Sequence, residues 1–283
     1  MTIAEIYREA LMLLRATHHE EEEARAIARI LTDEAAGARF SHLSQPEKVL
    51  DEATTARWRE QLNRVAWGEP LPYVLGRQEF CGLEFECDRR ALIPRPETEL
   101  LVEFAKTRLE DYPAPLVADL GTGSGCIAVA LAHFLPQAEV WATDISESAL
   151  ELARSNAQKH GIEGRMHFRQ GQNAAWAMPL EELKFDAVLS NPPYIPLREI
   201  ETLQLSVRRH EPHTALDGGD DGLDCYRQLA AQCRTLLNDS GFFACELGAG
   251  QWDEVKTIFQ SAGWAVDAPL HDLQEIPRVL IAH

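Results

Sequence analysis

Residues 191–194 read Asn-Pro-Pro-Tyr and carry the functional groups best suited to a reaction in this chain. They follow an apolar run, which predicts a buried strand that ends at the edge of a sheet. Asn191 offers a side-chain amide, Pro192 and Pro193 stiffen the turn, and Tyr194 adds an aromatic ring. This combination suits holding a planar nitrogen, such as an amide or a base amino group, in front of an electrophile. We therefore expect a catalytic role for Asn191, Pro192 and Tyr194.

A glycine-rich loop lies upstream, between a predicted strand and a predicted helix. Glycines let backbone amides approach a ligand closely, and a helix N-terminus favours polar or anionic groups. Asp144 ends the next predicted strand, where a carboxylate can accept both hydroxyls of a ribose. The pattern predicts a nucleotide-type cofactor site. Its expected members are Asp119, Gly121, Thr122, Gly123, Ser124, Gly125 and Asp144.

The spacing of the glycines argues against a dinucleotide. The dinucleotide fingerprint needs a glycine at its sixth position, where this chain has Cys126. The pattern Asp-x-Gly-x-Gly-x-Gly instead resembles the first motif of Rossmann-like methyltransferases that use S-adenosyl-L-methionine. Other nucleotide ligands remain open for so short a motif. The resemblance also implies that Gln172 and Asn191 contribute to the cofactor pocket.

The rest of the chain must bring these two loops together. From residue 115 onward the sequence alternates between strand and helix patterns. This alternation predicts an α/β fold with a mostly parallel sheet covered by helices on both faces. The carboxyl ends of parallel strands meet at one edge, where ligands bind. The expected strands are 116–120, 140–143, 166–169, 185–190, 241–246, one near 265, and 278–282, and the expected helices are 126–134, 146–160, 226–237 and 253–262.

The residues before this alternation show a different hydrophobic pattern. Apolar stripes at helical spacing predict a small all-helical domain over residues 1–75, with a third helix beginning near Pro46. It serves either partner recognition or packing alone, and we assign it to partner recognition. Residues 76–95 alternate around Gly82 as a β-hairpin linker would, and 96–283 form the predicted catalytic domain.

Composition limits the partners. The 283 residues carry a net charge of −18, which repels a phosphate backbone and disfavours direct binding of nucleic acid. The six cysteines include no C-x-x-C pair, so we expect no metal site. Neither a signal peptide nor a membrane span is indicated. We expect a cytoplasmic monomer.

Further segments resemble one family, the peptide chain release factor glutamine methyltransferases of the PrmC/HemK group. The similarity runs from about residue 65 to the end and includes Ile-Pro-Arg-Pro-Glu-Thr-Glu at 93–99 and Glu-Leu-Gly-Ala-Gly-Gln at 246–251. It implies a Rossmann-like S-adenosylmethionine-dependent methyltransferase sheet with a small all-helical N-terminal domain. It also implies methylation of N5 of the glutamine in the Gly-Gly-Gln motif of release factors.

The resemblance assigns roles within the site. The Asn191 side-chain oxygen and the Pro192 carbonyl would accept hydrogen bonds from the substrate NH₂, and Tyr194 would pack against the amide. Pro193 stiffens the same substrate-binding turn, and Glu211 would line the glutamine channel. No strong general base is needed, because the proton can leave after the methyl group arrives.

Three points remain open in the sequence. Arg95 either contacts the cofactor or partner, or forms a salt bridge between domains. Gly171 and Gln172 stand where the family carries an acid and an aromatic residue for the adenine, which predicts weakened cofactor affinity. The alternative functions are a ribosomal-protein glutamine methyltransferase, a nucleic-acid amino methyltransferase, and a non-catalytic cofactor-binding protein.

Overall fold

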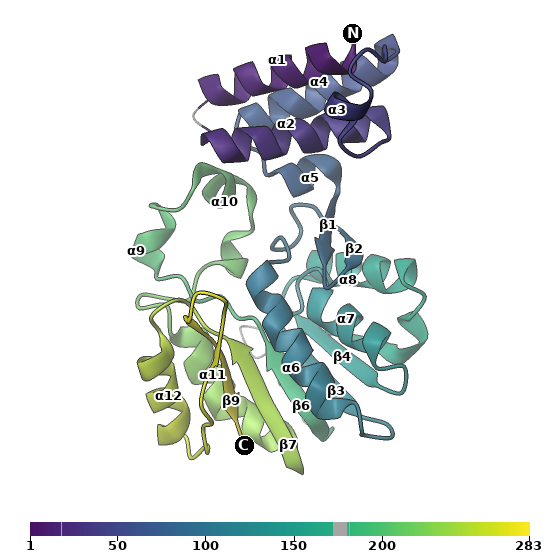
Figure 1. Cartoon of the computed structure of the whole chain (residues 1–283). Coiled ribbons are helices and arrows are strands. Elements are labelled where there is room, and N and C mark those ends of the chain that lie inside the picture. Colours follow the sequence, from purple (N-terminus) through teal and green to yellow (C-terminus); the bar gives the residue numbers. More distant parts are fainter. Residues whose placement is uncertain (18, 172–179, 181) are drawn as a thin grey trace. The chain divides into compact units, whose positions relative to one another are not determined.

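The computed structural model spans the chain and describes residues 1–17, 19–171, 180 and 182–283. It consists of two compact units, Met1–Gly76 and Arg77–His283 (Figure 1). Each unit has its own hydrophobic core. Within the described residues, no helix combines the length and apolar character needed to cross a bilayer.

The described residues of the first unit form helices joined by turns, with one isolated β-bridge between Thr2 and Val49. Its third long helix begins at Glu52, so the prediction of a start near Pro46 is wrong. The Asp51 carboxylate accepts a hydrogen bond from the backbone N–H of Thr54 at 2.8 Å and caps the helix there. The helices are α1 (Ile3–Ala16), α2 (Glu21–Ala36), α3 (Ser41–Ser44), α4 (Glu52–Ala66) and α5 (Leu71–Leu75).

The second unit opens with the predicted hairpin, formed by β1 (Arg77–Phe80) and β2 (Leu83–Glu86). The two residues between the strands, Cys81 and Gly82, both have positive φ, as a tight hairpin turn requires. A 3₁₀ turn, Pro96–Thr98, then leads into α6 (Glu99–Leu109).

A seven-stranded sheet follows in the order β5-β4-β3-β6-β7-β9-β8. The first five strands of this order are parallel, and β9 and β8 add antiparallel partners at one side. The strands are β3 (Leu116–Leu120), β4 (Glu139–Asp144), β5 (Met166–Gln170), β6 (Phe185–Ser190), β7 (Leu237–Glu246), β8 (Leu270–His271) and β9 (Pro277–Ala282).

Two clusters of buried side chains flank the sheet. One joins the sheet to α6, α7 (Cys126–Phe134) and α8 (Glu147–Lys159), and the other joins it to α11 (Asp224–Gln232) and α12 (Trp252–Ser261). Two short helices, α9 (Leu197–Ile200) and α10 (Leu205–His210), lie between β6 and α11 in the chain (Figure 1). The predicted α/β fold is therefore confirmed.

Several boundaries in the second half of the chain differ from the prediction. β7 begins at Leu237, before the expected start at residue 241. The helix expected over 226–237 ends at Gln232 and continues as a 3₁₀ turn, because Leu237 already pairs with Phe185 in the sheet. The strand expected near 265 is reduced to a single bridge between Val266 and Ala282.

Candidate functional site

The two loops singled out in the sequence leave the sheet side by side. β3 and β6 are parallel neighbours, and Leu120 pairs with Ser190 at their carboxyl ends. The glycine loop therefore begins beside Asn191, although 70 residues separate the paired positions in the sequence. A ligand held by one loop can contact the other.

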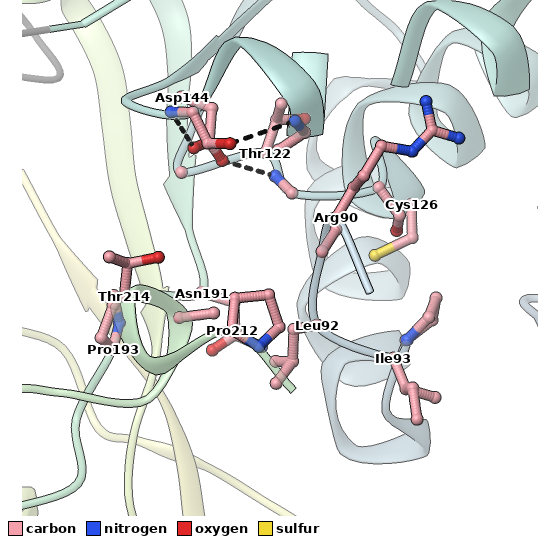
Figure 2. A pocket seen from close by; sticks show the side chains of 18 of the residues that line it. Arg90, Leu92, Ile93, Thr122, Cys126, Asp144, Asn191, Pro193, Pro212 and Thr214 are labelled. Carbon is pink, nitrogen blue, oxygen red and sulfur yellow. Dashed lines mark hydrogen bonds between the residues drawn. The ribbon is translucent and has the colours of Figure 1, made fainter. Parts of the chain in front are cut away.

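A cavity lies at this edge (Figure 2). It contains about 770 Å³ of empty space, a volume that includes open solvent at its mouth. Asp144 and Thr122 lie on one side of it, while Asn191, Pro193 and Pro212 lie on the other. The lining also includes residues 90–95, Thr98, Gly121, Gly123, Ser124, Cys126, Ile127, Ile145, Ser146, Ala149, Thr214 and Ala215.

The glycine loop is fixed by hydrogen bonds to the end of β4. The backbone N–H groups of Gly121 and Thr122 both donate to the carbonyl of Thr143 at 2.8 Å. The two oxygens of the Asp144 carboxylate accept from the backbone N–H groups of Gly123 and Ser146, each at 2.9 Å. Each oxygen keeps a further lone pair for a ligand hydroxyl. Burial raises the pKa of Asp144 above its ordinary value.

Two members of the glycine motif support the loop and do not line the cavity. Asp119 is fully buried, and its Oδ2 accepts from the Thr122 hydroxyl at 2.6 Å and from the Ala128 N–H at 3.2 Å. A Cβ on Gly125 would lie 2.9 Å from the Cβ of Ala153, so Gly125 allows close packing of α7 on α8. Asp119 and Gly125 therefore shape the loop from behind the cavity, and their cofactor-binding role stays a prediction.

Only part of the Asn-Pro-Pro-Tyr segment lines the cavity. Asn191 and Pro193 line the cavity, whereas Pro192 and Tyr194 do not. The Tyr194 hydroxyl donates to Glu246 at 3.3 Å, and burial raises the pKa of this hydroxyl above its ordinary value. The predicted packing of the tyrosine ring against a substrate amide therefore lacks support in the cavity lining.

Glu211 is buried and pairs with Arg95, and its predicted place along a glutamine channel stays a prediction. Its side chain is only 1% exposed, and its Oε1 lies 2.5 Å from the Arg95 guanidinium. Its other oxygen accepts from the backbone N–H of Ile93 at 3.3 Å. Glu211 therefore ties the wall 93–95 to the segment that carries Pro212, and it does not line the cavity. Because both partners lie in the second unit, the alternative of an interdomain salt bridge for Arg95 is wrong.

Sequence reasoning missed part of the lining. Thr98 and Ser146 line the cavity. Ser146 follows Asp144 by two residues, and Thr98 belongs to the segment 93–99 that carries part of the family resemblance. Gln172 lies outside the described residues, while the Gly171 N–H donates to the Asp144 carbonyl at 2.9 Å. Within the described part of the chain, no group of three or more His, Cys, Asp or Glu residues is placed to hold a metal ion.

The lining fits a nucleoside-type cofactor. Asp144 offers acceptors for hydroxyl groups, and Leu92 and Ile145 offer apolar surface. In addition, the buried Oδ1 of Asp119 has no hydrogen-bond partner among the described residues, directly beneath the loop. An unsatisfied buried oxygen at a loop of this kind indicates that a polar group or a water belongs nearby.

Comparisons with known proteins agree with this geometry. The chain matches the family models for the Methyltransferase small domain at residues 96–207 and for the PrmC N-terminal domain at residues 5–76. It is 44% identical to the release factor glutamine methyltransferase of Moorella thermoacetica, over 78% of this chain and 77% of that protein. The protein of the same name from Bradyrhizobium diazoefficiens is 42% identical, over 92% and 88% of the two chains. A methyltransferase structure from Pyrococcus furiosus shares the fold, with a TM-score of 0.54, 18% identity, and coverage of 79% of this chain and 97% of that one.

Proposed function

This chain belongs to the release factor glutamine methyltransferases, and we propose that the cavity at the ends of β3 and β6 carries out the reaction of that family. It is an S-adenosylmethionine-dependent enzyme that methylates a glutamine of a release factor. The atom methylated is N5 of the glutamine in the Gly-Gly-Gln motif. The observation that carries this proposal is that Asn191 and the glycine loop line one cavity.

The glycine loop and the end of β4 hold the cofactor. Gly121, Gly123 and Asp144 present backbone and carboxylate groups to the cavity, and Ser146 adds a hydroxyl. When bound there, S-adenosyl-L-methionine supplies an electrophilic methyl group on a sulfonium. A contribution from Gln172 is part of the proposal as well.

Asn191 and Pro192 position the nucleophile. An amide nitrogen is a poor nucleophile because its lone pair is delocalised into the carbonyl. The Asn191 Oδ1 and the Pro192 carbonyl each accept a hydrogen bond from the substrate NH₂, which aims the nitrogen lone pair into the cavity. Such positioning contributes several kcal/mol, with the reacting atoms about 3 Å apart. The nitrogen loses its proton after the methyl group is bonded.

The class of partner agrees with the charge. A net charge of −18 favours a protein substrate over nucleic acid. We infer that the separate helical unit Met1–Gly76 contributes to recognition of the release factor. We also propose that the enzyme works as a cytoplasmic monomer.

The proposal is tested by methyl transfer. The protein is incubated with labelled S-adenosylmethionine and, separately, a release factor, a ribosomal protein and DNA. We expect label in the release factor alone. Asn191→Ala should lower kcat by about 100-fold, since one preorganised hydrogen-bond acceptor is lost. The Kd of the cofactor, measured by calorimetry, serves as the control for an intact site. Transfer to DNA or ribosomal protein in preference to release factor, or a kcat unchanged by Asn191→Ala, would overturn the proposal.

A further inference from the structure

Behind Asn191, a buried carboxylate occupies the end of the neighbouring strand. Glu246 is the last residue of β7, and its pairing with β6 places it next to Asn191, since Ser190 pairs with Cys245. It is 2% exposed. Its Oε2 accepts from the Thr98 hydroxyl at 2.5 Å, and Thr98 in turn is 3.0 Å from Asn191 Nδ2. Three residues from distant parts of the chain thus form one hydrogen-bonded chain.

The direction of these hydrogen bonds is set by the carboxylate. An ionised carboxylate has no hydrogen to donate, so the single hydroxyl hydrogen of Thr98 is directed to Glu246. The Thr98 oxygen can then only accept, and the partner that donates to it is the NH₂ group of Asn191. An amide whose nitrogen faces Thr98 turns its oxygen the other way. Asn191 and Thr98 both line the cavity, whereas Glu246 lies behind them.

We propose that Glu246, acting through Thr98, sets the polarity of the Asn191 amide, so that its oxygen faces the substrate nitrogen. This inference rests on the proposed function, in which Asn191 accepts a hydrogen bond from the glutamine NH₂. Thr98 and Glu246 are positioning residues, because they act through Asn191. If the Asn191 amide were reversed, its NH₂ group would face the NH₂ group of the substrate glutamine. Both groups are hydrogen-bond donors, so the substrate nitrogen would turn away.

The Glu246 carboxylate also contacts Tyr194, at the other end of the segment Asn191–Tyr194. Glu246 Oε1 accepts from the Tyr194 hydroxyl at 3.3 Å. The Gln251 side chain donates to the Tyr194 carbonyl at 2.9 Å, which fixes the backbone at this point. Glu246 therefore anchors Asn191 and Tyr194 together, and the two prolines between them limit any compensating movement.

Protonation of Glu246 would undo this arrangement. Burial, aided by the nearby Glu97 carboxylate, raises the pKa of Glu246, while hydrogen bonds from Thr98 and Tyr194 and the charge of Arg278 lower it. The net pKa is about 7. A protonated Glu246 can donate to the Thr98 oxygen. The Thr98 hydrogen is then free to bond the Asn191 oxygen, which reverses the amide.

The test compares three variants of the full-length enzyme with wild type, using release factor and S-adenosylmethionine. Thr98→Val keeps the shape and removes the hydroxyl, and should lower kcat by about 10- to 100-fold, as misplacement of a positioned group does. The KM for release factor and the cofactor Kd should change by less than about threefold, because the binding surfaces remain. Thr98→Ser restores the hydroxyl and should recover most of the lost kcat. A melting curve for each variant reports whether it is folded.

The dependence of kcat on pH distinguishes an effect on the orientation of the Asn191 amide from an effect on packing alone. Between pH 6 and pH 8, the kcat of wild type should rise by roughly tenfold as Glu246 ionises. Glu246→Gln should give a lower kcat without this rise. Suppose that wild type methylates release factor. An undiminished kcat in Thr98→Val, or the same rise of kcat with pH in Glu246→Gln, would then overturn this inference and leave the proposed function standing. Absence of wild-type transfer to release factor would overturn the proposed function, and this inference with it.

Discussion

At the scale of single residues, Asp119 links the glycine loop to the pH dependence of folding. Burial raises the pKa of its carboxyl from 3.8 to about 7. The native state therefore binds this proton more tightly than the unfolded chain. The stabilising contribution is complete below about pH 4 and is lost as the pH rises through 7. We expect the stability of Asp119→Asn, relative to wild type, to increase by roughly 2 kcal/mol between about pH 5 and 7.

The measurement is urea unfolding of both proteins at several pH values. Asp111→Asn is the control, because Asp111 is exposed and its carboxylate stays in water in the folded and the unfolded chain. A difference between Asp119→Asn and wild type that stays constant with pH would mean that Asp119 is ionised throughout.

The sequence predicted the cavity members whose motif is local. Gly121, Gly123 and Asn191 could be named because the glycine pattern and Asn-Pro-Pro-Tyr are contiguous, and all three line the cavity. Thr98 could not be assigned its role, because its partners lie 93 and 148 residues away in the chain. Hydrogen bonds of this kind depend on the tertiary fold.

At the scale of elements, the close packing of α7 on α8 depends on Gly125. Its φ of +82° is left-handed, and a Cβ there would lie 2.9 Å from Ala153 Cβ and 3.2 Å from Ala153 Cα. We expect Gly125→Ala to destabilise the protein by roughly 2 to 3 kcal/mol, from backbone strain together with overpacking. Urea denaturation measures this loss.

Gly161→Ala is the matched control for this substitution. Gly161 has a φ of +67°, and a Cβ there would meet nothing within 4 Å. Gly161→Ala should lower the free energy of unfolding by only about 1 kcal/mol, because it adds backbone strain alone. Equal losses in the two variants would show that Gly125 has no special packing role.

Element boundaries were predicted well where the pattern is strong and local. β3, α7 and β6 have the expected bounds, since each is an apolar run that ends at a glycine, proline or asparagine signal. The start of α4 and the end of α11 were missed. The first depends on the Asp51 cap and the second on pairing of Leu237 with a distant strand, and neither changes the local periodicity.

At the scale of the whole molecule, the chain divides into two units, and the cavity belongs to one of them. The cavity and the described residues that line it lie in Arg77–His283. The helical unit Met1–Gly76 contributes none of them, but it carries Met12, Leu43 and Trp67, which are 70%, 73% and 79% exposed. Exposed aromatic and aliphatic side chains of this size are typical anchors of protein interfaces, although single ones are common on any surface.

We therefore expect a chain comprising residues 77–283 to bind the cofactor as before and to bind release factor more weakly. Its Kd for S-adenosylmethionine should stay within about threefold of the full chain, because a unit with its own core folds as a unit. Its kcat/KM for release factor should fall by about tenfold or more, through KM, as contacts outside the cavity are lost. In the full chain, Trp67→Ala should raise KM in the same direction without changing the cofactor Kd. If the shortened chain methylates release factor with an unchanged KM, the helical unit is a packing platform and the partner is recognised by the catalytic unit alone.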